Sequence, residues 1–191
     1  LNLEYLYLYN NRLQGPIPLS IGSLSKLEEL DLEDNRLQGP IPSSIGSLSK
    51  LEYLYLNDNR LQGPIPSSVG NMKRLEELYL NDNRLQGPIP SSISSLSNLE
   101  YLYLNNNSLT GSWSPILSLR SLYDVDLSYN KLAGSFVASS FAKMENLRYL
   151  SLSHNSLVGS IPANVVKSLP QLSVLRLTGN HLNLSSTSRD E

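Results

Sequence analysis

Apolar and polar residues alternate along short stretches of this chain in a way that predicts strands with one buried face. Leu54 and Leu56 alternate with Tyr53 and Tyr55. A period of two is typical of a strand that packs one side against a core and exposes the other. After this stretch, further apolar residues follow at wider spacing, at Leu61, Ile65, Val69 and Met72. We expect them to continue the same core through the path back to the next strand.

The alternating stretches belong to an internal repeat. The string Leu-Gln-Gly-Pro-Ile-Pro occurs four times at steps of 24 residues, beginning at Leu13, Leu37, Leu61 and Leu85. Full units of 23–25 residues begin at Leu3, Leu27, Leu51, Leu75, Leu99, Leu122 and Leu147, and a partial eighth begins at Leu172. One unit cannot bury its apolar side chains, whereas stacked units form a continuous core with parallel strands in register. We predict a repeat array over residues 1–184 and a polar tail or linker over residues 185–191.

Asparagine and glycine each recur at one position of the unit. The asparagines are Asn11, Asn35, Asn59, Asn83, Asn107, Asn130, Asn155 and Asn180. The glycines are Gly15, Gly39, Gly63, Gly87, Gly111, Gly134 and Gly159. An amide side chain donates and accepts hydrogen bonds, so stacked asparagines are expected to satisfy the backbone of a buried turn. Glycine at the second position indicates a positive φ or close packing.

The full unit, Leu-x-x-Leu-x-Leu-x-x-Asn-x-Leu-x-Gly-x-Ile-Pro, resembles the plant-specific class of leucine-rich repeats. Such repeats occur in receptor-like kinases, receptor-like proteins and polygalacturonase inhibitors. The resemblance covers nearly the whole chain. It implies an α/β-type repeat solenoid, a curved right-handed superhelix with a parallel β-sheet on the concave face and short 3-10 or irregular segments on the convex face. Members usually carry cysteine-paired caps. This chain has no cysteine and both ends stop inside the pattern, so we expect a piece of a longer solenoid.

The first four units are nearly identical, whereas the later ones diverge. Trp113 and Phe136 stand where earlier units have the isoleucine of Gly-x-Ile-Pro, and Ser114 and Val137 replace its last proline. We expect the larger rings to occupy the same core position as the isoleucine.

Tyrosines and carboxylates are concentrated at the predicted exposed strand positions. All eleven tyrosines are assigned to these positions, namely Tyr5, Tyr7, Tyr9, Tyr53, Tyr55, Tyr79, Tyr101, Tyr103, Tyr123, Tyr129 and Tyr149. Neighbouring strands lie about 4.8 Å apart, so equivalent tyrosines of consecutive units are expected to touch. Only Arg148 and Arg176 bring positive charge to the same positions. We therefore predict an acidic, aromatic strand face and basic turns and convex side, although the net charge is only −2.

This composition predicts a surface that recognises a protein or peptide with basic groups. The candidate binding residues are Tyr53, Tyr55, Tyr79, Tyr101, Tyr103, Glu29, Asp31, Glu77, Asp124 and Asp126. Tyrosine gives rigid amphipathic contact area, and carboxylates favour and attract a cationic partner. The same residues also fit plain strand chemistry, because tyrosine favours strands and cross-strand aromatic pairs stabilise sheets.

A second row of charge is formed by Arg12, Arg36, Arg60, Arg84 and Lys131. Three aspartates, Asp34, Asp58 and Asp82, stand two positions before arginines and are expected to interleave with them. We interpret the row as a solvent-exposed charge lattice in preference to an anion-binding edge for sulfated or uronic polymers.

The sequence gives no reason to propose an enzyme, a cofactor or a metal site. The two histidines, His154 and His181, occupy different positions of their units. The glycines follow the repeat and not a phosphate-binding motif, and the carboxylate pairs are predicted on an open face. The charge balance makes no case for nucleic acid, and no apolar run is long enough for this segment to cross a membrane.

Two triplets, beginning at Asn106 and Asn183, match the acceptor pattern for N-glycosylation. The resemblance implies an extracellular or cell-surface recognition module of the receptor kind. An inhibitor of the polygalacturonase-inhibitor kind and a structural scaffold in any compartment remain alternatives. An ice- or polysaccharide-binding surface is a lesser one, because large acidic and aromatic residues do not make a flat ice-binding face.

Overall fold

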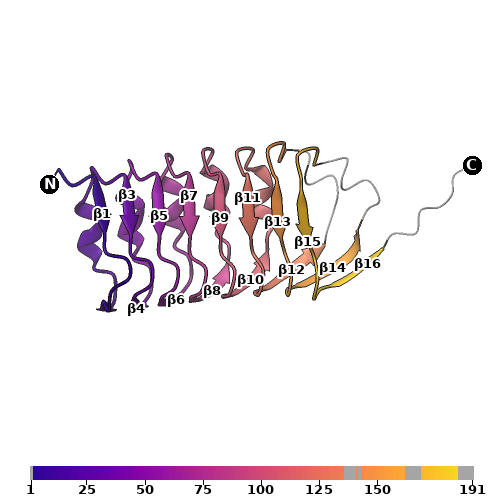
Figure 1. The fold of residues 1–191 in the computed structure, drawn as a ribbon, viewed down its shortest axis with the longest axis horizontal. Coiled ribbons are helices and arrows are strands. Elements are labelled where there is room, and N and C mark those ends of the chain that lie inside the picture. Colours follow the sequence, from indigo (N-terminus) through magenta and orange to yellow (C-terminus); the bar gives the residue numbers. More distant parts are fainter. Residues whose placement is uncertain (1, 136–140, 142, 162–168, 185–191) are drawn as a thin grey trace, which may run out of the picture.

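The computed structural model describes residues 2–135, 141, 143–161 and 169–184, so the predicted tail lies outside the described residues. The first sheet is parallel and contains eight strands in chain order. They are β1 (Tyr5–Tyr7), β3 (Glu29–Asp31), β5 (Tyr53–Tyr55), β7 (Glu77–Tyr79), β9 (Tyr101–Tyr103), β11 (Asp124–Asp126), β13 (Tyr149–Ser151) and β15 (Val174–Arg176). These strands stand side by side along the long axis of the molecule (Figure 1).

A second parallel sheet of eight strands runs along the molecule beside the first. Its strands are β2 (Gln14–Gly15), β4 (Arg36–Gly39), β6 (Arg60–Gly63), β8 (Arg84–Pro88), β10 (Ser108–Ser112), β12 (Lys131–Ser135), β14 (Ser156–Ile161) and β16 (His181–Leu184). The residues just before each Pro-Ile-Pro segment pair with the neighbouring unit, because their backbone donors precede the prolines.

Short 3-10 helices complete the first five units. They are η1 (Leu19–Ser23), η2 (Ser43–Ser47), η3 (Ser67–Asn71), η4 (Ser91–Ser95) and η5 (Ser114–Ser118). Helices η1 to η4 each follow a proline in the extended region, whose ring restricts φ and ends the preceding extended path. The predicted repeat solenoid with parallel strands and 3-10 segments is therefore confirmed.

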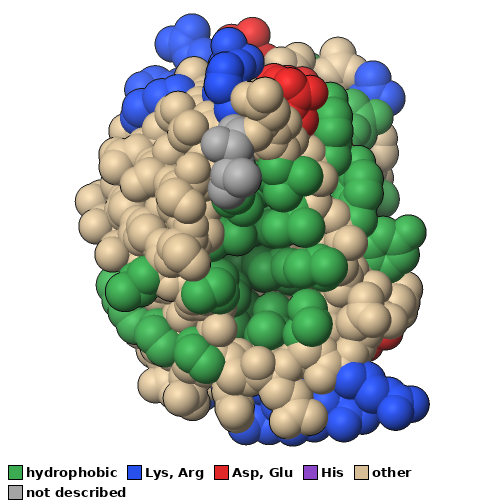
Figure 2. All heavy atoms as spheres, turned by 90° about the vertical axis from the view of Figure 1, so that its left-hand side faces the viewer, with side chains coloured by type: hydrophobic (Ala, Val, Ile, Leu, Met, Phe, Trp, Pro, Cys, Tyr) green, Lys and Arg blue, Asp and Glu red, His purple; other side chains and the backbone are tan. Residues whose placement is uncertain are grey.

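The core is a column of leucines and isoleucines that runs through every described unit. Leu54 and Leu56 are almost completely buried, while Tyr53 and Tyr55, which alternate with them, remain partly exposed. Seen from the N-terminal end, hydrophobic side chains fill the centre between the two sides of the unit (Figure 2). Trp113 is 2% exposed and its ring lies 5.5 Å from that of Phe141, so it fills the isoleucine position as expected. Phe136 and Val137 lie outside the described residues.

The asparagine ladder forms as predicted. Asn59 donates from Nδ2 to the carbonyl oxygens of Leu32, Leu56 and Asn57, at 2.9, 3.3 and 3.1 Å. Its Oδ1 accepts the backbone N–H of Leu37 at 2.9 Å. One amide thus satisfies backbone groups of two consecutive units, which stabilises the buried turn after each strand.

The aspartates expected to interleave with arginines have a different role. Asp34, Asp58 and Asp82 lie in the left-handed region, with φ of 46°, 53° and 54°. This conformation favours aspartate and asparagine among non-glycine residues. In the part of the chain that the structure describes, the one ion pair joins Arg74 to Glu52 at 3.7 Å. The predicted interleaving is therefore wrong, because turn geometry and not charge pairing selects these aspartates.

The predicted distribution of basic residues is only partly correct. Lys and Arg side chains gather at two opposite edges of the end view, where the chain turns (Figure 2). The five 3-10 helices, with the sequences LSIGS, SSIGS, SSVGN, SSISS and SPILS, carry no charge. These 3-10 helices are therefore rich in serine and uncharged, although Lys73 beside them donates to the carbonyl oxygens of Gly70 and Ser95. No helix within the described ranges is long and apolar enough to cross a membrane.

Candidate functional site

The outward-facing residues of the first sheet form three rows, which together we call the strand face. Row 1 holds the residue directly before each strand, namely Glu4, Glu28, Glu52, Glu76, Glu100, Tyr123, Arg148 and Ser173. Row 2 holds the first residue of each strand, namely Tyr5, Glu29, Tyr53, Glu77, Tyr101, Asp124, Tyr149 and Val174. Row 3 holds the third residue, namely Tyr7, Asp31, Tyr55, Tyr79, Tyr103, Asp126, Ser151 and Arg176. Within row 2, and likewise within row 3, the parallel pairing places each residue directly beside its equivalent on the neighbouring strand.

Row 3 contains a ladder of three tyrosines in contact. The rings of Tyr55 and Tyr79 lie 4.9 Å apart at 62°, and those of Tyr79 and Tyr103 lie 4.7 Å apart at 75°. Edge-to-face packing of this kind suits the quadrupole of the ring. The expected contact between equivalent tyrosines is confirmed for these three. Tyr53 and Tyr101, in row 2, do not meet, because the strand that carries Glu77 lies between theirs.

The tyrosine hydroxyls are tied to carboxylates of the following unit. Tyr55 donates to Glu77 Oε2 at 2.8 Å, and Tyr53 donates to Glu76 Oε2 at 3.3 Å. Burial raises the pKa of Tyr55, and the hydrogen bond to Glu77 raises it further, so this hydroxyl stays neutral. Burial likewise raises the pKa of Tyr79 and Tyr103. The carboxylates therefore position the rings as well as giving the face its negative charge.

Three of the candidate aspartates differ in accessibility. Asp31 is buried, and its Oδ1 accepts the backbone N–H of Glu33 at 3.0 Å. Asp124 has one carboxylate oxygen, Oδ1, that is shielded from solvent and receives no hydrogen bond. Burial raises the pKa of both carboxyls. Asp126 accepts the backbone N–H of Ser128 at 2.8 Å. Of the three, Asp31 contributes least to the accessible surface.

Two arginines lie over tyrosine rings at the C-terminal part of the strand face. The guanidinium carbon of Arg148 lies 4.9 Å from the ring centroid of Tyr123, and that of Arg176 lies 5.4 Å from the centroid of Tyr149. These distances fit cation–π contacts. Neither arginine forms an ion pair with a described carboxylate. The sequence identified both as the positive charges of the strand positions, and aligning the rows places Arg148 beside Tyr123. Arg176 instead aligns with Ser151 and reaches Tyr149 diagonally, which the alignment does not reveal.

Two tyrosines assigned to strand positions lie elsewhere. Tyr9 follows β1 and is exposed. Tyr129 lies in the turn after β11 with a φ of 54°, and its ring stacks on His154 at 4.4 Å. The assignment of these two to the strand face is therefore wrong, because both stand after the last buried leucine of the strand segment.

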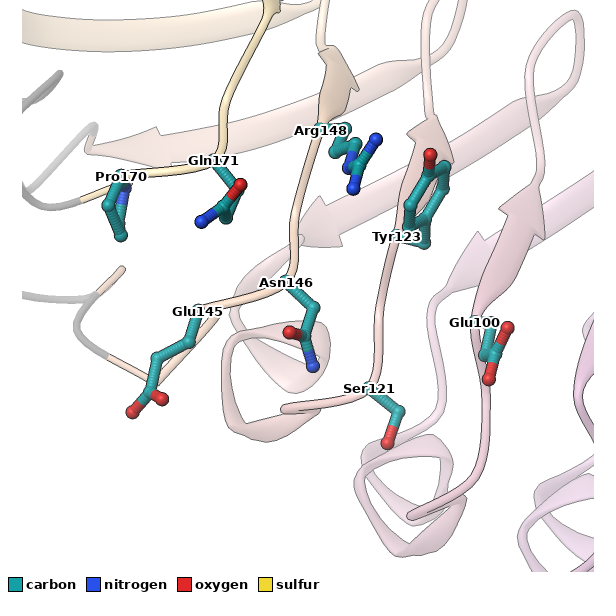
Figure 3. A pocket seen from close by; sticks show the side chains of 8 residues that line it. All are labelled: Glu100, Ser121, Tyr123, Glu145, Asn146, Arg148, Pro170 and Gln171. Carbon is teal, nitrogen blue, oxygen red and sulfur yellow. The ribbon is translucent and has the colours of Figure 1, made fainter.

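Two hollows lie toward the C-terminal part of the strand face. One hollow of about 650 Å³ is lined by Glu100, Ser121, Tyr123, Glu145, Asn146, Arg148, Pro170 and Gln171 (Figure 3). A second, of about 300 Å³, lies beyond row 3, and its lining includes Asn106, Asp126, Tyr129, Ser151, His154 and Arg176. Sequence reasoning missed both hollows, because they depend on the shape of units that depart from the repeat.

The two candidate glycosylation sites are accessible. Asn106 is exposed, has a φ of 53° and donates to Asp82 Oδ1 at 2.7 Å. Asn183 lies on β16 and is also exposed, whereas Ser185 of its triplet lies outside the described residues.

Comparison with known proteins places this geometry in context. Residues 1–183 match the family model of the leucine-rich repeat region. The structure is similar to that of the Arabidopsis receptor kinase HAESA in complex with the peptide hormone IDA and the co-receptor SERK1. The two are 37% identical with a TM-score of 0.86, over 95% of this chain and 30% of that chain. No curated protein sequence matches the chain significantly.

Two further structures show the breadth of the likeness. The plant peptide hormone receptor RGFR1, in complex with RGF2, is 32% identical with a TM-score of 0.74, over 95% of this chain and 32% of that one. A plant ice-binding protein is 28% identical with a TM-score of 0.75, over 94% of this chain and 65% of that one. The chain thus spans about a third of the length of the receptor kinases that it resembles.

Proposed function

This chain belongs to the leucine-rich repeat proteins, and from that membership and the strand face we propose that it is a non-catalytic module that recognises a protein or peptide. The observation that carries the proposal is the ladder of Tyr55, Tyr79 and Tyr103, whose half-buried rings pack edge to face and whose first member is tied to Glu77 by a hydrogen bond. A rigid aromatic surface loses little conformational entropy on binding, so it suits recognition. The receptors HAESA and RGFR1 were solved with peptide hormones.

The proposed binding residues are those of rows 2 and 3 in the middle of the array. They are Tyr53, Tyr55, Tyr79, Tyr101, Tyr103, Glu29, Asp31, Glu77, Asp124 and Asp126. We propose a partner with basic groups, because row 1 carries a carboxylate on each of the first five strands and row 2 adds one on the second and fourth. Only one of these row 1 carboxylates, Glu52, forms an ion pair among the described residues. Binding is then expected to weaken as the salt concentration rises.

The test is a selection of peptides on the intact chain. A random peptide library displayed on phage is enriched on the chain and on a variant with Tyr55→Ser, Tyr79→Ser and Tyr103→Ser. A matched control changes Arg36, Arg60 and Arg84 to Gln, since these exposed residues lie on the second sheet. Peptides that bind the chain and the control but not the tyrosine variant support the proposal. Peptides that bind all three equally contradict it, provided that circular dichroism shows the variants folded.

We further propose that the module acts outside the cell or at its surface and carries glycans at Asn106 and Asn183. Both side chains are exposed. Mass spectrometry of the natively sourced protein measures occupancy at the two sites. Occupancy at either supports the secretory route, and absence at both favours a scaffold role in another compartment.

A further inference from the structure

Row 2 of the strand face has a chemical period of two units, although the fold repeats with every unit. Tyrosine and carboxylate alternate along the first seven strands of the sheet. The tyrosines are Tyr5, Tyr53, Tyr101 and Tyr149, and the carboxylates between them are Glu29, Glu77 and Asp124. Each of the two central tyrosines is therefore flanked on both sides by a carboxylate of the same row. An aromatic face beside carboxylates is an environment that favours a cation.

The molecule already places a guanidinium on one member of this row. Arg176 lies over the ring of Tyr149, and Asp126 accepts the hydroxyl of that tyrosine at 3.4 Å. Arg148 lies over Tyr123 in row 1 in the same manner. Both arginines that reach the strand face thus lie on tyrosines. Tyr53 and Tyr101 likewise lie beside carboxylates, and Tyr101 also contacts the ring of Tyr123, whose centroid lies 5.7 Å away. No described arginine or lysine lies over either ring.

The distance between these two rings is set by the sheet. Tyr53 and Tyr101 are two strands apart in a parallel sheet, which corresponds to about 9.6 Å. A polyproline II segment has three residues per turn and a rise of about 3.1 Å, so residues i and i+3 share one side at about 9.3 Å. A β-strand places same-side residues at about 6.6 or 13 Å, and two turns of an α-helix span about 10.8 Å. The polyproline II spacing is the nearest match.

We propose that Tyr53 and Tyr101 each receive the guanidinium of an arginine from an extended, polyproline II-type segment whose arginines are three residues apart. The segment lies across the strands along row 2, with Glu29, Glu77 and Asp124 beside its cations. This inference rests on the proposed function and deepens it, because it names the chemistry of the partner and the spacing that the surface reads.

The experiment uses two acetylated and amidated peptides of identical length and composition, made only of arginine and proline. The first has three arginines with two prolines between neighbours, and the second has three arginines with one proline between neighbours and the remaining prolines at its ends. Their affinities for the chain are measured by isothermal titration calorimetry. They are measured also for a variant with Tyr53→Leu and Tyr101→Leu and for the control Tyr9→Leu, which removes an exposed tyrosine outside the three rows.

The first peptide is expected to bind the chain and the Tyr9→Leu control about 3–10 times more tightly than the second, because two cation–π contacts form at once. The Tyr53→Leu, Tyr101→Leu variant should bind both peptides equally. Equal binding of the two peptides to the unaltered chain, or no binding of either, overturns the inference. So does a preference that survives in the tyrosine variant. The phage selection above judges the proposed function separately, because it depends on Tyr55, Tyr79 and Tyr103 in row 3.

Discussion

The first four units and the later ones solve the same packing problem with different degrees of regularity. In the first four, almost every residue repeats, and every unit has a carboxylate in row 1 of the strand face. In the later units the core leucines and the asparagines persist, while Trp113, Arg148 and Arg176 interrupt the pattern. Both described hollows lie there. The difference teaches that contacts between neighbouring units restrict the scaffold positions, whereas the outward positions are free to specialise.

The asparagine ladder should matter equally in both parts, which makes its removal the strongest test of that view. Asn59 and Asn155 are both buried and each makes three donor contacts and one acceptor contact. Changing either to Ala leaves buried backbone groups unsatisfied and is expected to cost about 2–4 kcal/mol of unfolding free energy. The measurement is urea unfolding followed by circular dichroism. The control Asn11→Ala, at an exposed position with two contacts, should cost well under half as much. A much smaller cost at Asn155 than at Asn59 would show that the later units use another scaffold.

Replacing the large ring of the irregular part should distinguish a refilled core from a loosely packed one. Trp113→Ile restores the residue of the regular units, but it leaves a space beside Phe141 and is expected to destabilise by about 2–3 kcal/mol. The reciprocal change Ile65→Trp inserts a ring into a full core and should cost about 1–3 kcal/mol. Thermal unfolding of the two variants measures both. A stabilising effect of Trp113→Ile would mean that the ring strains its site.

The glycine of the 3-10 helix is lost at the junction between the two parts, where the fourth unit meets the fifth. A Cβ on Gly46 would overlap the carbonyl oxygen of Ser68 in the next unit, so Gly46→Ala is expected to cost about 1–3 kcal/mol. The equivalent residue of the fourth unit is Ser94, which is exposed. There the next helix follows Trp113 in the right-handed helical region and not an extended proline. Ser94→Ala should therefore stay within about 0.5 kcal/mol in the same unfolding assay, and equal costs would contradict the comparison.

The smallest expected effect concerns a buried carboxyl in each part. Burial raises the pKa of Asp124, so its charged form is disfavoured in the folded state. As the pH falls through this raised value toward about 3.9, the unfolded pKa, the chain should gain stability relative to the Asp124→Asn variant. Asp31→Asn should show the same sign, because burial also raises the pKa of the Asp31 carboxyl, against the opposing hydrogen bond from the backbone N–H of Glu33. Unfolding in urea between about pH 4 and 7 measures both, and a gain as the pH rises would refute the assignment.

The repeat made much of this architecture predictable. Once Leu54 and Leu56 define the buried side, the outward side of each strand follows, and with it the ladder of Tyr55, Tyr79 and Tyr103. The asparagine ladder followed from the needs of a buried turn. These features depend only on register, which the sequence states directly.

Other features required coordinates because they depend on more than register. The second sheet forms where residues before Pro-Ile-Pro reach the next unit, and extended chain alone does not reveal its partner. The role of Asp58 is set by a positive φ, so charge reasoning misassigned it. The hollow beside Arg148 arises from the particular path of the later units. Each needs a local conformation that the alternation of leucines does not encode.

The alternation of tyrosine and carboxylate in row 2 bears on how such an array can change its length. Loss or gain of a single unit leaves the fold intact, since every unit stacks on every other in the same way. It shifts the alternation by one position, however. Beyond the junction, a partner group that had faced a tyrosine of row 2 would then face a carboxylate. Loss or gain of two units preserves the phase. The fold can therefore change its length by single units, but the pattern of tyrosine and carboxylate on its surface is kept only when units are lost or gained in pairs.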